Sequence, residues 1–306
     1  MKAAPLTLDS SKILTPKKRR VLFYRRDNRG EKSLTASLMK GIQKHGDECR
    51  TVLSTDFLKD PDWGGAEVVF IGRSLPGSKI VIEAARRDKV QFVYYDKGYF
   101  NRGWKTEDPQ VYYRFSVNNF QPLEYFQAVP RPPDRWQKLA IELEPRKKGS
   151  SIVVAGYSEK FAAFFGVDAK KHTDEMIHAI QKKTDKPIAY RARTTPGSTE
   201  GFNSKPKGQE ARKMQDLFEN AHALVTFASN AAADAVIAGV PAFTLGPSIA
   251  RPVSNTDLSL INDPWFPSEK ERLQWACDLA YCQWRVEEME DGSLWQSLKE
   301  VLSRGT

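Results

Sequence analysis

The segment ALVTFASNAAADAVIAGVPAFTLG, residues 223–246, is the clearest indication of the fold in this chain. Residues 223–229 are an apolar run of strand length, and residues 230–239 are a small-residue helical pattern that ends at Gly239. After Pro241, residues 241–246 form a second strand-sized run. A strand, a helix and a strand in close succession predict a parallel βαβ unit, in which ligands bind beyond the carboxyl ends of the strands.

The same alternation extends outward through the rest of the chain. In the first half we expect strands at 21–25, 49–54, 66–72 and 91–96, with helices at 34–46 and 78–88. In the second half we expect further strands at 151–156 and 187–193, with helices at 171–183 and 210–221. We expect a polar loop at 27–33, irregular aromatic-rich chain at 97–135, and continuous helix at 268–289 after a Ser268/Glu271 capping box, then a last helix. The pattern predicts an α/β protein of two Rossmann-like domains.

The predicted organisation has four parts. They are a flexible basic arm (1–18), an N-terminal acceptor-binding domain (19–145), a C-terminal nucleotide-sugar donor domain (150–267) and crossing helices (268–306) that pack back across the domains. The acceptor and donor roles come from the resemblance described below.

Composition limits the class of protein. The chain has 306 residues, 40% of them hydrophobic, which is enough for two packed cores and too much for general disorder. No apolar run approaches the roughly 20 residues of a membrane span, and the N-terminus lacks a secretory pattern. Three cysteines exclude a disulfide framework, and we expect Cys277 and Cys282 to be reduced core thiols. We therefore expect a cytoplasmic protein without a membrane span.

The net charge of +9 allows two interpretations. Clusters of basic residues at 17–20, 25–29, 131–148 and 191–207 are consistent with a polyanionic partner such as nucleic acid, an anionic membrane surface or a phosphorylated ligand. A charged, solvated surface without any such partner has the same composition. Charge alone does not choose between them.

The start of the predicted helix 230–239 is a candidate phosphate site. Ser229 or Asn230 can cap this helix, and the small residues that follow, Ala231 first, would let a phosphate approach backbone amides. Asp234 lies one turn later on the face of Asn230, from which a carboxylate could accept hydrogen bonds from a ribose diol. The alternative is an ordinary cap on a buried, alanine-rich helix.

Residues 223–248 resemble the donor half of GT-B glycosyltransferases. The shared pattern is a strand, a small polar pair at a helix start, an acidic residue one turn later, then Gly-Val-Pro and a strand. The resemblance covers roughly residues 150–285; strand 187–193 and its Pro/Gly loop also resemble capsule-type members, and sugar epimerases share much of the pattern. It implies two Rossmann-like domains facing a cleft. It further implies that Ser229, Asn230 and Ala231 hold the donor pyrophosphate and that Asp234, in place of the commoner Glu, holds the ribose.

Other residues after strands of the second half are candidates for donor binding. The turn after strand 151–156 commonly contacts donor phosphate or sugar, although it could equally be a plain βα loop. Two arginines alternate along strand 187–193, where guanidinium groups suit a pyrophosphate leaving group; a surface pair is the alternative. The loop after strand 241–246 is where donor sugar hydroxyls are often bound. The candidates are Gly156, Tyr157, Ser158, Arg191, Arg193, Pro247, Asn255 and Asp257.

The first half must supply the acceptor site and the general base. A carboxylate at a strand end is well placed to take a hydroxyl proton; Asp96 is the first candidate and Asp27, after the first strand, the second. A structural Asp that caps the next turn is the alternative. Arginines and amides interleaved with aromatics at 112–122 suit bases or a sugar face, or a plain β-hairpin. The acceptor-binding candidates are Arg25, Arg26, Lys97, Tyr99, Arg114, Asn118 and Asn119.

Taken together, the chain looks similar to phage DNA-modifying glycosyltransferases. That resemblance implies transfer of a sugar from a nucleotide-sugar donor, with a UDP-sugar as the first candidate, to the hydroxymethyl group of a modified pyrimidine in duplex DNA, within the host cytoplasm. The alternatives are a surface polysaccharide or lipopolysaccharide glycosyltransferase, or a non-catalytic nucleic-acid-binding protein on a GT-B scaffold. We expect a monomer with no tightly bound cofactor. We also expect no metal requirement, because basic residues are available to hold the pyrophosphate.

Overall fold

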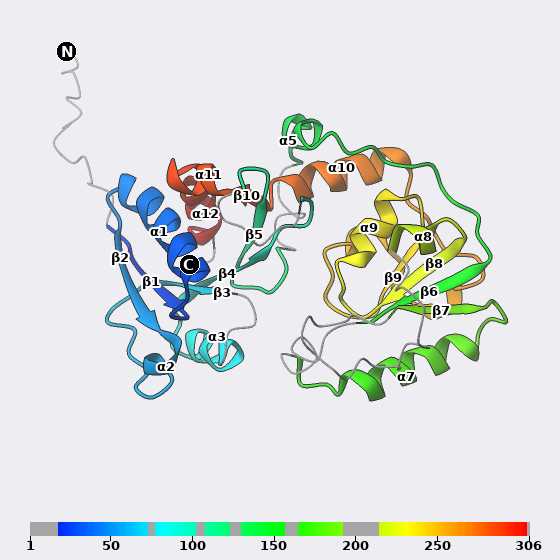
Figure 1. The fold of residues 1–306 in the computed structure, drawn as a ribbon, viewed down its shortest axis with the longest axis horizontal. Coiled ribbons are helices and arrows are strands. Elements are labelled where there is room, and N and C mark those ends of the chain that lie inside the picture. Colours follow the sequence, from blue (N-terminus) through cyan, green and yellow to red (C-terminus); the bar gives the residue numbers. More distant parts are fainter. Residues whose placement is uncertain are drawn as a thin grey trace, which may run out of the picture.

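The chain folds around two β-sheets. The computed structural model describes residues 18–72, 77–101, 108–122, 130–156, 165–191 and 214–304. The first sheet has the strand order β10-β5-β4-β3-β1-β2 and the second has the order β7-β6-β8-β9. Each sheet is the centre of one lobe in Figure 1. The two Rossmann-like domains expected from the sequence are therefore present.

Strands and helices alternate in the first domain, as the sequence predicts. The elements are β1 (Arg20–Arg25), α1 (Arg29–Lys44), β2 (Glu48–Leu53), α2 (Ser54–Phe57), β3 (Val68–Gly72), α3 (Ser78–Arg87) and β4 (Gln91–Lys97). These four strands pair parallel with one another. Both sheet faces are apolar: Phe23 packs in one cluster with Leu38 of α1, and Leu22 in another with Val81 of α3. Such double burial is typical of a parallel sheet covered by helices on both sides.

Helix α1 begins earlier than the sequence suggests. The polar loop expected at 27–33 is wrong from Arg29 onward, because the side-chain oxygen of Asn28 accepts a hydrogen bond from the amide of Glu31 at 2.9 Å. An N-cap of this kind satisfies a backbone donor of the first turn, which lets polar residues begin a helix.

The carboxyl side of β4 continues into an antiparallel edge. Strand β5 (Tyr112–Val117) pairs antiparallel with β4, and β10 (Gln283–Arg285) pairs antiparallel with β5. The expectation of irregular chain over 97–135 is therefore wrong for β5, where the hairpin alternative holds. The continuous helix expected at 268–289 is also wrong, since β10 separates α10 (Glu269–Ala280) from α11 (Val286–Glu290).

The C-terminal elements return to the first domain, as expected. The Ser268/Glu271 capping box starts α10, and α11 and α12 (Ser293–Leu302) pack beside α1 in Figure 1. The indole Nε1 of Trp295 donates to the carboxylate of Asp47 at 2.6 Å. Cys277 and Cys282 are buried free thiols, as the sequence predicts.

The second domain is built around a fully parallel sheet. Its elements are β6 (Ser151–Ala155), α7 (Ala169–Gln181), β7 (Ile188–Arg191), α8 (Met214–Phe218), β8 (Ala221–Thr226), α9 (Ala231–Ile237) and β9 (Ala242–Thr244), followed by 3-10 helices η1 (Arg251–Val253) and η2 (Leu258–Leu260). All neighbouring strands are parallel, so their carboxyl ends lie at one edge.

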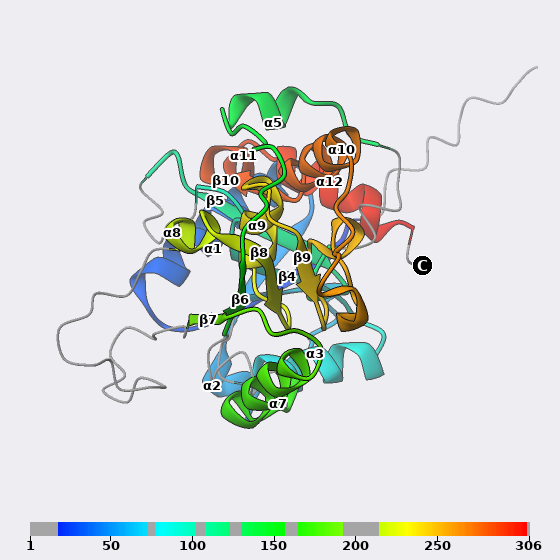
Figure 2. The same cartoon turned by 90° about the vertical axis from the view of Figure 1, so that its right-hand side faces the viewer.

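The two connections between the domains lie against each other. Helix α5 (Asp134–Lys138) belongs to the first connection and α10 to the second, and they are neighbours in Figures 1 and 2. The hydroxyl of Tyr281 donates to the carboxylate of Asp134 at 2.7 Å. Arg135 forms an ion pair with Glu288 and also donates to the carbonyl of Gln283. These polar contacts join the first connection to the returning chain.

Candidate functional site

Asp96 lies near the carboxyl end of β4, beside the antiparallel edge. One of its carboxylate oxygens, Oδ1, accepts a hydrogen bond from the amide of Lys97 at 2.8 Å. The other, Oδ2, lies 3.4 Å from the donating hydroxyl of Tyr94 and 3.6 Å from Nη2 of Arg114 on β5. A quarter of the Asp96 side chain remains exposed. The result is a carboxylate held by two hydrogen bonds and one ion pair and still accessible, as a general base requires.

Arg114 and Tyr99 were predicted to contact the acceptor, and the structure places both in the interior. Arg114 is 4% exposed, and its Nη1 donates to Oε1 of Gln121 at 2.6 Å and to the hydroxyl of Tyr99 at 3.2 Å. Tyr99 is fully buried. The assignment to acceptor contact is corrected for these two residues, because their polar atoms face one another.

The remaining acceptor candidates divide between two edges of the first sheet. Arg25, Arg26 and Lys97 end or follow β1 and β4 at the carboxyl edge, all half-buried. Asn118 instead accepts a hydrogen bond from the amide of Phe92 at 2.9 Å, at the amino end of β4. Its position is wrong for the predicted site. The side chain of Asn119 caps the amide of Phe120.

Asp27, the second candidate base, is exposed to solvent. Its carboxylate is 61% exposed and forms ion pairs with Lys32 at 2.5 Å and Arg25 at 3.8 Å. The hydrogen bond from Lys32 holds the pKa of Asp27 below its usual value. Asp27 is largely solvated and bound to two cations, whereas Asp96 is partly buried at the sheet edge, so the geometry favours Asp96.

The predicted phosphate cradle at the start of α9 already has intrachain partners. The hydroxyl of Ser229 accepts from the amide of Ala231 at 3.2 Å, and the Ser229 carbonyl accepts from Ala232 at 3.2 Å. The carbonyl of Asn230 accepts from Ala233 at 3.0 Å, while the Asn230 side chain makes no capping bond. Ser229 is therefore the local cap, and these three amides are occupied within the chain.

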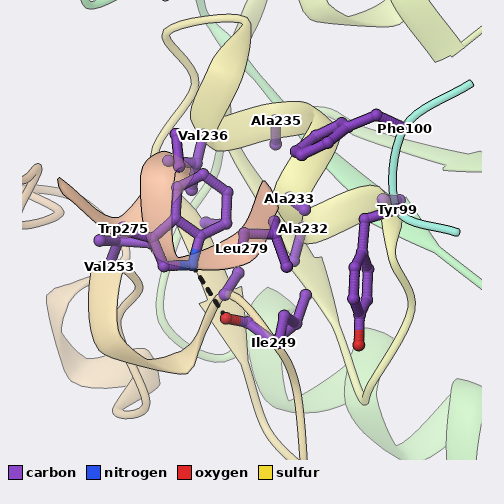
Figure 3. Close-up of a cluster of buried hydrophobic side chains, with 14 of the residues drawn as sticks. Tyr99, Phe100, Ala232, Ala233, Ala235, Val236, Ile249, Val253, Trp275 and Leu279 are labelled. Carbon is purple, nitrogen blue, oxygen red and sulfur yellow. Dashed lines mark hydrogen bonds between the residues drawn. The ribbon is translucent and has the colours of Figure 1, made fainter. Parts of the chain in front are cut away.

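The packing of α9 explains why its first turn consists of alanines. Tyr99 and Phe100, from the turn after β4, belong to the same buried cluster as Ala232, Ala233 and Ala235 of α9. Figure 3 shows both aromatic side chains beside this helix, with Trp275 of α10 on its other side. Small residues thus admit aromatic side chains from the other domain, which is a structural reason for the pattern that suggested a phosphate site.

Other donor candidates lie at the carboxyl edge of the second sheet. Gly156 directly follows β6, and a Cβ there would lie 2.7 Å from the hydroxyl of Tyr190, so a larger residue would displace the Tyr190 side chain. Arg191 ends β7, and Asp234 is half-buried in the first turn of α9. Pro247 follows β9 and is also half-buried. Tyr157, Ser158 and Arg193 lie outside the described residues.

Asp257 and Asn255 lie toward the opposite edge. Asn255 is buried, and its side chain donates to the carbonyl of Ala242, where β9 begins. Asp257 caps η2 by accepting from the amide and hydroxyl of Ser259. The next residue after η2, Ile261, bonds through its carbonyl to His222 at the start of β8. Asp257 thus caps η2, on the chain that leads to the start of β8, and its binding of the donor sugar stays a prediction.

The chain contains an Asp-x-Asp triplet, Asp60-Pro61-Asp62, which bears on the expectation of metal-free donor binding. It precedes β3, and Asp62 accepts a hydrogen bond from the amide of Gly64 at 2.7 Å. The loop leads into the amino end of β3, opposite the carboxyl edge that carries Asp96. Within the described ranges, no three His, Cys, Asp or Glu side chains form a group that could hold a metal ion.

The carboxyl edges of the two sheets meet through aromatic side chains. Phe120 packs on Tyr94 of β4, with ring centroids 4.9 Å apart, and on Phe165 of the second domain at 5.4 Å. Phe165 in turn contacts Phe227, which directly follows β8, at 5.7 Å. Phe165 and Phe227 were not among the predicted site residues, because nothing in their local sequence pattern indicates a partner in the other domain. This row of rings defines the inter-domain junction.

Comparisons with known proteins address the fold. No protein-family model and no curated protein matches the chain. The solved structure of Thermosulfurimonas dismutans KpsC, a β-Kdo 2,4 transferase, covers 85% of this chain and 90% of its own, with 12% identity and a TM-score of 0.51. The match to the solved structure of the T. dismutans KpsC β-Kdo 2,7 transferase covers 90% of this chain and 99% of that chain, with 12% identity and a TM-score of 0.48.

No helix in the described part of the chain is long and apolar enough to cross a membrane. The structural likeness agrees with an architecture of two sheets, one mixed and one parallel. The chain thus has the fold of two Rossmann-like domains known from GT-B glycosyltransferases, with its C-terminal elements packed back on the first domain.

Proposed function

We propose that this protein is a glycosyltransferase that moves a sugar from a nucleotide-sugar donor to a hydroxyl acceptor. The observation that carries the proposal is the position of Asp96, an accessible carboxylate at the carboxyl edge of the first sheet. This edge meets the second domain at the inter-domain junction. In open α/β sheets, ligands bind beyond such edges. The fold likeness to a Kdo transferase supports the same chemistry.

The proposed reaction needs a base, a nucleophile and a stabilised leaving group. The carboxylate of Asp96 would take the proton of the acceptor hydroxyl, and the freed oxygen would attack the anomeric carbon. The bond from that carbon to the donor phosphate breaks as the new C–O bond forms, and its electron pair leaves with the nucleotide. Arg191, at the end of β7, is our candidate for stabilising the charge that develops on the phosphate.

A saccharide is the acceptor we favour. The supporting observation is the structural likeness to a protein that transfers Kdo, an acidic sugar. Basic residues at the carboxyl edge of the first sheet, Arg25, Arg26 and Lys97, would suit an acidic acceptor or product. We propose no tightly bound cofactor and no metal, so that transfer should continue in EDTA.

A hydroxymethylated pyrimidine in duplex DNA is the second candidate acceptor. The net charge of +9 supports it, because contacts to phosphates release counterions and give salt-dependent binding. A gel-shift series from low to physiological salt tests this candidate. Binding that weakens steeply with salt supports a DNA acceptor, whereas a flat response argues against it.

The experiment for the proposed function is mass spectrometry of products. The protein is incubated with UDP-, GDP-, dTDP- and CMP-sugars, each with hydroxymethylated DNA, plain DNA or oligosaccharides that end in neutral or acidic sugars. A mass increase of one glycosyl unit supports the proposal. Asp96→Asn should reduce transfer by about 100-fold or more, and Asp27→Asn should leave it largely intact. No glycosylated product from any pairing would overturn the function, and the reverse pattern of the two variants would reassign the base.

A further inference from the structure

Arg114 occupies an unusual position for a charged residue. It lies on β5, between β4 and β10, directly opposite Asp96 in the antiparallel register. The guanidinium packs against the rings of Phe120, Tyr94 and Tyr99, with centroids 4.9, 5.5 and 5.5 Å from its central carbon. A guanidinium does not lose its charge in proteins, so burying one is costly unless a counterion and acceptors surround it.

The structure supplies both the counterion and the acceptors. The ion pair that Arg114 makes is with Asp96, from Nη2 to Oδ2. Its other terminal nitrogen, Nη1, is held by Gln121 and by the hydroxyl of Tyr99, which also donates to Gln121 at 2.9 Å. Because Nη1 is fixed on the inner side, the planar guanidinium presents Nη2 to the carboxylate in one orientation.

We propose that Arg114 is a positioning residue for Asp96, which fixes the direction of that carboxylate's accessible oxygen edge. The inference rests on the proposed function, in which Asp96 is the general base. Arg114 faces Oδ2 and the amide of Lys97 holds Oδ1, so the carboxylate has one orientation, and a general base acts only when it is directed at the proton that it takes. The role differs from contact with the acceptor, because Arg114 itself faces the interior.

Two other donors in the described part of the chain bond to the Asp96 carboxylate. The hydroxyl of Tyr94, on the same strand, donates to Oδ2, and the amide of Lys97 donates to Oδ1. Arg114 is the cation that faces the carboxylate from β5. Tyr99 interacts electrostatically with both Arg114 and Asp96, but burial raises its pKa far above the usual value, so it remains neutral. From the second domain, Phe165 reaches this region through Phe120 and carries no charge.

The test compares kcat and the donor KM in four forms of the enzyme, with the donor and acceptor found by the product screen. Arg114→Met keeps the bulk of the side chain and removes the charge. Ser116→Ala is the matched control, because Ser116 is buried on the same face of β5, opposite Tyr94, and does not contact Asp96. Gln121→Leu keeps the charge and removes the acceptor that orients Nη1.

For Arg114→Met we expect kcat at neutral pH to fall at least tenfold, with less than a twofold change in the donor KM. Gln121→Leu should lower kcat severalfold with the donor KM unchanged, and Ser116→Ala should match the wild type. A wild-type kcat in a folded Arg114→Met enzyme, or a donor KM that rises in step with the loss of kcat, overturns the proposal.

The controls separate this inference from the proposed function. If Arg114→Met does not fold, Gln121→Leu decides, and a wild-type kcat in that variant overturns the positioning role. If the wild-type protein transfers no sugar, the proposed function fails and the inference fails with it. If the wild type is active but these variants behave like Ser116→Ala, only the role of Arg114 is refuted.

Discussion

Replacing Arg135 should loosen the attachment of the C-terminal chain to the first domain. Its guanidinium makes a two-point ion pair with Glu288, at 2.5 and 3.1 Å, and lies 4.3 Å from the centre of the Trp284 ring. It also donates to the carbonyls of Ala280 and Gln283, at 3.2 and 2.8 Å. The two charged side chains are 15% and 18% exposed. This single side chain therefore holds several groups of the segment that contains β10.

The cost of Arg135→Ala follows from what it leaves behind. Removing one partner of a buried ion pair costs about 3–5 kcal/mol of stability. Because both side chains keep some exposure, we expect Arg135→Ala to lower the free energy of unfolding by about 3 kcal/mol. That value corresponds to a fall of about 1 M in the urea midpoint of a chain with a slope near 3 kcal/mol/M.

The assay is urea unfolding followed by tryptophan fluorescence, with Arg87→Ala as the matched control. Arg87 makes a similar two-point pair with Asp88, at 2.7 and 3.0 Å, but its side chain is 73% exposed. Its removal should leave the midpoint at the wild-type value. Equal midpoints for Arg135→Ala and the wild type would refute the reasoning that this contact holds the returning chain.

Three further predictions concern stability and the donor site. Gly41→Ala should destabilise the protein by about 1–3 kcal/mol in thermal unfolding, because its Cβ would overlap the carbonyl oxygen of Met289. Gly30→Ala, in the same helix, should stabilise slightly, because its Cβ would make only an ordinary contact with Asn28. Burial and nearby Asp47 raise the pKa of Cys49 to about 12. In the unfolded chain this thiol ionises at about pH 8.5, which stabilises the unfolded state above that pH. The midpoint of urea unfolding should therefore fall as the pH rises above about 8.5, and it should fall less in Cys49→Ala. Asp257→Ala should leave the donor KM unchanged in transfer assays, and a severalfold increase would return Asp257 to the donor site.

Much of the fold could be predicted because its strands are local apolar runs bounded by turns. Residues 223–246 specify a βαβ unit through composition and spacing alone, and the structure has β8, α9 and β9 there. Strand β10 could not be predicted in the same way. Its three residues, Gln283 to Arg285, follow a helix without any turn signal, and they become a strand because β5 offers an unpaired edge. That pairing joins residues far apart in the chain.

The candidate site shows the same division. Asp96 could be placed at a strand end from its neighbours, and the structure puts it there. The burial of Arg114 depends on Gln121 and Tyr99, whose approach requires the antiparallel turn from β4 to β5. The alanines after Asn230 have the composition of a phosphate site, but they also accommodate aromatic side chains of the other domain. Composition does not distinguish a surface left open for a ligand from one covered by a distant segment.

The central claim is that a nucleotide sugar binds where the carboxyl edges of the two sheets meet. A crystal structure of the protein with the donor identified by the product screen tests it most directly. We expect density for the nucleotide beside the carboxyl ends of β6, β7 and β8, with the sugar directed toward Asp96. Donor density at the opposite edge, near Asp257 and η2, or a junction in which no donor binds, would contradict the account.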